Sequence, residues 1–218
     1  MRAIRHRRAE GRDGGHTVVE LTVAIGLLSL VVAAAFGVVI VMQNQSVKTT
    51  DRFTAEGEGQ TIADRITKDL RTAVASSSTA AAFASADVND VTFYANLSDP
   101  SGPTRLHAYV ALQPGTNVYV FHEDSTKADA GGSPGNYAYT TFPTVSRLDG
   151  RYLDTSQPIF TYFDADNIQL TTPIITTSGL RSIASVGINL RIRVRPNAPT
   201  VVISTLIHVR NVDYNPNS

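Results

Sequence analysis

The chain contains no cysteine, and its first 93 residues contain neither proline nor tyrosine. The lack of cysteine excludes disulfide frameworks, thiolate metal sites and cysteine nucleophiles. All ten prolines and all eight tyrosines fall at or after Tyr94. Because proline interrupts helices, the first part favours helix, whereas the later part, rich in Thr, Val, Ile, Tyr, Pro and Gly, favours strands and turns. The composition therefore predicts an α+β protein in which the helical part comes first.

The chain has no net charge, but the charge is unevenly distributed. Residues 1–15 carry five arginines against Glu10 and Asp13, a net charge of +3, and the remainder carries 14 basic and 17 acidic residues, a net charge of −3. Binding of nucleic acid needs a basic surface, so we expect no nucleic-acid partner. Nucleophile-elbow, Walker A and dinucleotide-binding motifs are also missing, so we expect neither enzymatic activity nor a cofactor.

Residues 21–42 form a run of 22 residues without a charge. Spanning a bilayer takes about 20 apolar residues, and the apolar region of a cleaved secretory signal has roughly 7–15. The run is therefore predicted to be a membrane helix that stays on the mature protein. Arginines that precede such a helix remain in the cytoplasm, which places the C-terminal bulk of the chain outside it.

The string GHTVVEL, residues 15–21, stands between the arginine-rich leader and the apolar run. It resembles the class III signal of type IV pilins and type II secretion pseudopilins. The resemblance implies that prepilin peptidase cleaves after Gly15, that His16 becomes an N-methylated N-terminus, and that Glu20 is the fifth mature residue. Phenylalanine is usual where His16 stands. The chain then divides into a leader at residues 1–15, a long helix at 16–75 and an antiparallel β-sheet head at 76–218.

The resemblance implies a structural subunit that assembles through its N-terminal helix with other minor subunits and with the major subunit. A carboxylate in hydrocarbon is costly, and the positive N-terminus of a neighbouring subunit is the expected partner of Glu20 during assembly. The expected location is a single pass through the cytoplasmic membrane with the head extracytoplasmic, and the cell surface or periplasm after assembly. Both a type IV pilus and a secretion pseudopilus fit. The alternative is a signal-anchored β-domain that works alone as a binding module.

Residues 43–75 continue in helical composition after the apolar run. The string DRITKDLRTA, residues 64–73, resembles the helix of J-type minor pseudopilins and W-type minor pilins. Four apolar residues share one helical face that can pack on a sheet: Ile62, Ile66, Leu70 and Ala73. Two pairs of opposite charge are expected on the outer face: Asp64 with Lys68, and Arg65 with Asp69. Gly37, Gly57 and Gly59 each cost the helix about 1 kcal/mol relative to alanine.

Strand patterns follow from Val91 to the end of the chain. Residues 106–112 and 117–122 are predicted to form a hairpin around a Pro-Gly turn, and residues 158–163 a further strand. The strings SVGINLRIRVR and VVISTLIHVRNV alternate between apolar and polar residues, which is typical of strands with one face in water. Residues 75–90 are predicted to be a linker or the frayed end of the helix. Residues 123–150 are predicted to be a long surface loop.

Few side chains of the head suggest chemistry. His107, His122 and His208 lie on predicted strands and are expected to be structural. The string DADN, residues 164–167, begins like a calcium loop, but Ile168 stands where an oxygen ligand is needed, so we expect no metal site. Three alternate arginines, Arg191, Arg193 and Arg195, form a basic row on one strand face. Such a row could meet an anionic partner, but we expect a solvated row that protects a sheet edge.

Overall fold

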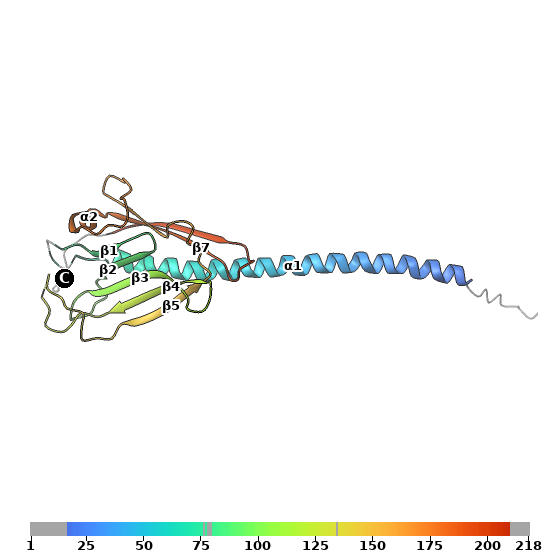
Figure 1. Cartoon of the computed structure of the whole chain (residues 1–218), viewed down its shortest axis with the longest axis horizontal. Coiled ribbons are helices and arrows are strands. Elements are labelled where there is room, and N and C mark those ends of the chain that lie inside the picture. The colour runs from blue at the N-terminus through green and yellow to red at the C-terminus, as the bar shows by residue number, and fades with distance from the viewer. Residues whose placement is uncertain (1–16, 76, 78–79, 134, 210–218) are drawn as a thin grey trace, which may run out of the picture. The chain divides into compact units, whose positions relative to one another are not determined.

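The computed structural model describes residues 17–75, 77, 80–133 and 135–209 of the 218-residue chain. In chain order its elements are α1 (Val18–Arg71), β1 (Phe83–Ala86), β2 (Asp90–Ala95), β3 (Thr104–Leu112), β4 (Tyr119–Thr126), β5 (Val145–Arg151), β6 (Phe160–Phe163), α2 (Thr177–Ser182), β7 (Ser185–Ile192) and β8 (Val201–His208) (Figure 1). The predicted α+β class is confirmed. The chain divides into two compact units, Met1–Val47 and Lys48–Ser218, and α1 runs through the boundary between them.

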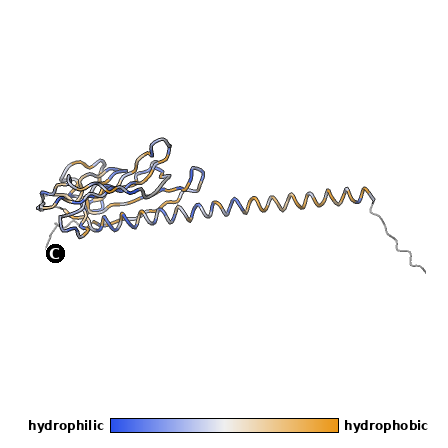
Figure 2. The backbone as a smooth tube through the Cα atoms, turned by 90° about the horizontal axis from the view of Figure 1, so that it is seen from below, coloured by the Kyte–Doolittle hydropathy of each residue, from blue (hydrophilic) through white to orange (hydrophobic). Residues whose placement is uncertain are grey.

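In the first unit, α1 carries the whole apolar run in continuous helix (Figure 2). Its large apolar side chains are exposed, for example Leu21 at 58% and Leu28 at 62%. No residue of the most apolar window is buried by the rest of the chain. Within the described ranges, α1 is the one helix that is long and apolar enough to cross a membrane. Its exposed apolar surface has no cover in the single chain, which is the state expected of a segment that lies in lipid.

In the second unit, the remaining part of α1 packs its apolar stripe against two sheets. The four predicted stripe residues are all buried: Ile62, Ile66, Leu70 and Ala73. The helix ends at Arg71, and Ala73 already forms an isolated bridge with Ala95 of β2. Gly59 lies at a close approach of α1 to β7 and β8, because a Cβ atom there would overlap Ile203 and lie 3.0 Å from Cδ1 of Ile192. Burial of this apolar stripe stabilises this part of α1 more than the interactions within the helix do.

The first sheet has five antiparallel strands in the order β1-β2-β3-β4-β5. The predicted hairpin is confirmed as β3 and β4, which pair from Arg105 with Thr126 to Leu112 with Tyr119. Gly115 takes the left-handed conformation in its turn, with φ of 75°, which glycine adopts without strain. Apolar residues on alternate positions face the core: Val91, Phe93, Leu106, Ala108 and Phe121.

The second sheet has three antiparallel strands in the order β6-β7-β8. The predicted alternation is confirmed, since every second residue of β7 is buried: Val186, Ile188, Leu190 and Ile192. On β8 the inward residues Val201 and Ile207 are buried, and Val202 and Leu206 between them are about half exposed. The two sheets are linked where the N–H groups of Ile159 and Phe160 both donate to the carbonyl of Val88, each at 2.9 Å.

The structure corrects two predicted segments. Residues 75–90 are not only a linker, because they contain β1. Residues 123–150 are not one loop, because Glu123–Thr126 completes β4 and Val145 begins β5, so the connection covers residues 127–144. Polar residues interrupt the apolar alternation that would predict these strands. The outer face of the strands is in water, and Glu123 makes an ion pair on the inner face. The short helix α2 also lies outside the predicted elements.

Candidate functional site

The N-terminus of α1 is closed by a pair of reciprocal hydrogen bonds between Thr17 and Glu20. The backbone N–H of Glu20 donates to Oγ1 of Thr17 at 3.2 Å, and the backbone N–H of Thr17 donates to Oε2 of Glu20 at 3.0 Å. The Thr17 carbonyl accepts the first helical bond, from Leu21, at 3.1 Å. This is a capping box, in which the side chains at the N-cap and N3 positions satisfy backbone donors that the helix leaves open.

The capping box gives Glu20 a role in the single chain that the sequence reasoning missed. Its carboxylate lies in the first turn of α1, where the positive end of the helix dipole also favours a negative charge. The Thr-x-x-Glu spacing of residues 17–20 was the available signal. Gly15 and His16, the predicted cleavage and methylation residues, lie outside the described residues. Of the three predicted site residues, the structure therefore positions Glu20, exposed at the start of the apolar helix.

An ion pair joins the second part of α1 to the five-stranded sheet. Nη2 of Arg65 lies 2.9 Å from Oε1 of Glu123 on β4, with side-chain exposures of 27% and 7%. Arg65 was expected on the outer face beside Asp69. Its charge does act on Asp69, but the outer-face placement is wrong because Arg65 turns toward the sheet. Burial raises the pKa of the Asp69 carboxyl, and the nearby positive charge of Arg65 opposes this rise. Asp64 accepts a hydrogen bond from Nε2 of Gln60 at 3.0 Å.

The three strand histidines are in contact with neighbours within the head. These contacts are His107 Nε2 with Asp90 Oδ2 at 2.7 Å, His208 Nδ1 with Ser185 Oγ at 2.7 Å, and the His122 ring stacked on Tyr109 at 5.0 Å. In the DADN string, Oδ1 of Asp164 accepts from the N–H groups of Asp166 at 3.0 Å and Ile168 at 2.8 Å, which closes a local turn. Over the part of the chain that the structure describes, no three His, Asp or Glu side chains are grouped to hold a metal ion.

The arginine row does not protect a sheet edge, which corrects the prediction. Arg191 lies on β7, the middle strand of its sheet, whose two sides are both paired, and Arg193 and Arg195 follow the end of this strand at Ile192. Two of the arginines make ion pairs and the third donates to a carbonyl: Arg191 Nε to Asp154 at 3.4 Å, Arg195 Nε to Asp51 of α1 at 2.9 Å, and Arg193 Nη1 to Pro196 O at 3.4 Å. The row therefore serves mainly to hold β7 and its following loop to other elements.

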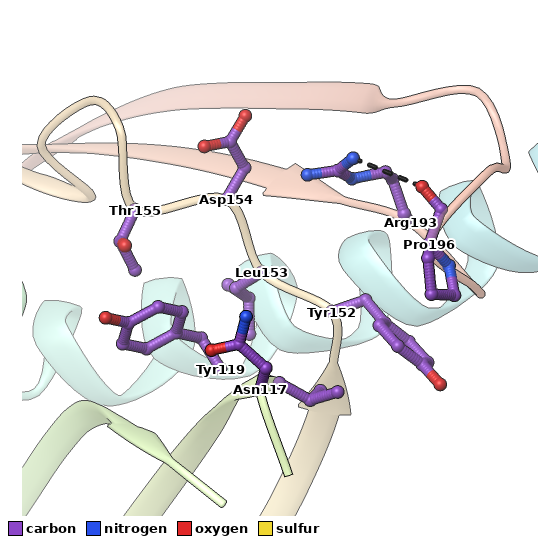
Figure 3. A pocket seen from close by; sticks show the side chains of 9 residues that line it. Asn117, Tyr119, Tyr152, Leu153, Asp154, Thr155, Arg193 and Pro196 are labelled. Carbon is purple, nitrogen blue, oxygen red and sulfur yellow. Dashed lines mark hydrogen bonds between the residues drawn. The ribbon is translucent and has the colours of Figure 1, made fainter.

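A hollow of about 530 Å³ opens in the second unit, where three connections meet. They are the β3–β4 turn, the segment after β5 and the β7–β8 connection. Figure 3 shows Tyr119 and Tyr152 on either side of Asn117, with Asp154 and Arg193 on the opposite wall. No sequence pattern predicts this hollow, because its walls come from three separate segments, residues 117–119, 152–155 and 193–196, which meet only in the folded head.

A comparison of the chain with models of known protein families finds no match. None of the curated proteins matches it either.

Proposed function

We propose that this chain is a minor pilin or pseudopilin, a structural subunit of a type IV pilus or a type II secretion pseudopilus. Prepilin peptidase cleaves it after Gly15, His16 is then N-methylated, and the subunit is stored in the cytoplasmic membrane with its head outside. The observation that carries the proposal is the start of α1. A capped helix begins within three residues of the proposed cut, with Glu20 in its first turn and the exposed apolar run directly after it.

The two parts of α1 differ in whether their apolar side chains are buried, and this difference supports the proposed role. One part presents apolar side chains without cover, and the other part buries its stripe under antiparallel sheets. A helix with exposed apolar side chains associates with lipid or with copies of itself. A helix with one buried apolar stripe packs against a folded domain and holds that domain in place. A subunit that moves from a membrane into a helical assembly needs both parts.

Glu20 then has two successive roles. Before assembly, its carboxylate caps its own helix, which lowers the cost of a charge beside the apolar run. During assembly, the positively charged N-terminus that cleavage creates on a neighbouring subunit pairs with this carboxylate and sets the register between helices. In a low-dielectric bundle the pair is orienting, because a displaced neighbour would leave a charge without its partner.

Variants at residues 17 and 20 separate these two roles. Glutamine can occupy the N3 position of a capping box, so Glu20→Gln keeps the cap and removes only the charge, whereas Glu20→Ala removes both. Thr17→Val removes the Thr17 half of the cap and keeps the charge, at a cost to the helix of about 1 kcal/mol. We expect normal cleavage in all three variants. Assembly should fall strongly in both Glu20 variants and only slightly in Thr17→Val.

The measurement is the amount of each variant in sheared fibres or in purified complexes of minor subunits, relative to its amount in membranes. Wild-type assembly of Glu20→Gln would contradict the charge pairing. Equal defects in Thr17→Val and Glu20→Gln would instead assign the effect to helix capping.

A further inference from the structure

Tyr152, in the segment after β5, has an unusual backbone conformation for a bulky residue. Its φ of 55° lies in the left-handed region, which is costly for a residue of this size. Three backbone hydrogen bonds hold the segment in place. Leu153 N donates to the carbonyl of Tyr119 at 3.1 Å, Asp154 N donates to that of Arg191 at 2.9 Å, and the Tyr152 carbonyl accepts from Arg193 N at 3.3 Å. The segment therefore bridges the two sheets, and the bridge directs the Tyr152 side chain to the wall of the hollow.

The walls of the hollow combine aromatic rings with planar polar groups (Figure 3). Tyr119, at the start of β4, is 40% exposed although aromatic side chains gain by burial. The Asn117 amide, the Asp154 carboxylate and the Arg193 guanidinium can each make two parallel hydrogen bonds to neighbouring groups of one ligand. Binding sites generally consist of such apolar surfaces with a few placed polar groups.

The charged side chains of the hollow, Asp154 and Arg193, differ in whether they have a partner of opposite charge among the described residues. Hydrogen bonds from Ser156 hold the pKa of the Asp154 carboxyl below its usual range, so it is an ionised acceptor near neutral pH. Its charge is already balanced by Arg191, whose Nε lies 3.4 Å away. Among the described residues, Arg193 has no carboxylate within ion-pair distance and makes only a 3.4 Å bond to the Pro196 carbonyl. Within the described ranges of the head, the hollow therefore offers one guanidinium whose charge is not matched by a carboxylate.

We propose that this hollow binds a pyranose sugar that carries a carboxylate, as in an acidic surface glycan. A pyranose ring has an apolar C–H face that stacks on an aromatic ring, and vicinal hydroxyl groups that match amide and carboxylate side chains. Tyr119 and Tyr152 supply the stacking surfaces, Asn117 and Asp154 bind hydroxyl groups, and Arg193 binds the sugar carboxylate. The proposal concerns the folded head and does not depend on cleavage or assembly of the subunit.

The test uses the full chain in a detergent without a sugar headgroup, because glycosidic detergents would compete. Saturation-transfer NMR with methyl glucuronide, methyl galacturonide and neutral methyl glucoside as probes detects binding and ranks it. We expect the two acidic glycosides to bind at least about tenfold more tightly than the neutral one. Arg193→Gln should abolish this preference and leave weak binding of all three.

Tyr152→Asn is the sharpest variant, because asparagine adopts the left-handed conformation readily and so keeps the backbone while removing the ring. It should lose binding by about tenfold or more while its melting temperature stays within a few degrees of the wild type. Tyr119→Ala should also lose binding. Phe142→Ala is the matched control for Tyr119→Ala. Phe142, at 39%, is as exposed as Tyr119 but lines a different hollow, so this variant should bind the glycosides normally. Absence of binding by the wild type, or unchanged binding by folded Tyr152→Asn, would overturn the proposal.

Discussion

Arg65 on α1 and Glu123 on β4 form an ion pair across the interface between the helix and the five-stranded sheet. Their nitrogen and oxygen atoms are 2.9 Å apart, and the Glu123 side chain is almost fully buried. Removing two charges from water is costly, so such a pair adds little net stability over apolar residues of similar size. It does penalise every other rotation of α1 on the sheet, because a rotated helix would leave the Glu123 carboxylate without the guanidinium.

Removing one partner of this pair should therefore cost more than removing both. We expect Arg65→Leu to lower the free energy of unfolding by about 3 kcal/mol, since the buried carboxylate loses its countercharge. The double variant Arg65→Leu/Glu123→Leu should recover at least half of this loss. Urea unfolding of the full chain in detergent provides the measurement. A double variant as unstable as Arg65→Leu would show that the pair itself contributes the stability.

Gly57 and Gly59 provide a matched pair of helix variants. A Cβ atom at Gly57 would meet nothing within 4 Å, so Gly57→Ala should stabilise the head by about 1 kcal/mol through helix propensity alone. A Cβ atom at Gly59 would overlap the terminal methyl group of Ile203, which must shift to make room, so Gly59→Ala should lose part or all of this gain. Thermal unfolding of the two variants measures the difference. A Gly59→Ala variant as stable as Gly57→Ala would contradict the close approach of α1 to β8.

Asp69 and Asp99 should give opposite pH dependences. Burial raises the pKa of Asp69 above its unfolded value of about 4, so ionisation of Asp69 lowers stability as pH rises through the folded pKa. Asp69→Asn should therefore be more stable than the wild type at pH 7, with a difference that disappears below about pH 4.

The backbone N–H of Ser101 holds the pKa of Asp99 below its usual range, with Lys127 as a further cause after the opposing effect of burial. Its stabilising effect is present above the unfolded pKa and is lost as pH falls through the folded pKa. Asp99→Asn should thus be less stable than the wild type at pH 7 and equal to it in strong acid. Unfolding curves from strong acid to pH 7 test both residues. The same sign of change in the two variants would contradict this assignment.

The sequence predicts those parts of the fold whose pattern is local. Two such patterns are confirmed. Ile62, Ile66 and Leu70 recur at helical spacing, and apolar residues recur at every second position of β7. Strand β1 was missed because four residues rich in Ala and Ser carry no alternation. The end of β4 and nearly all of β5 fall in a segment whose pattern predicts a loop. In β4 the pattern misleads because Glu123 is a charge on the buried face, and its partner Arg65 is 58 positions away.

The candidate sites divide in the same way. The capping box of Thr17 and Glu20 is a three-residue spacing and was available from the sequence. The hollow between Tyr119, Tyr152 and Arg193 was not, because three separate connections form it and the left-handed conformation of Tyr152 is set by hydrogen bonds from both sheets. Strand order likewise placed β7 in the middle of its sheet, which no alternation of arginines could indicate.

The most direct test of the proposed function is the intact mass of the protein from cells with an active prepilin peptidase. A processed subunit begins at His16 and carries one methyl group on its new N-terminus. Gly15→Leu is the matched control, because a bulky residue at the cut should prevent cleavage and leave residues 1–15 in place. We predict a wild-type mass that corresponds to residues 16–218 plus one methyl group. A wild-type mass that retains residues 1–15 would contradict the proposal and favour a signal-anchored domain that acts alone.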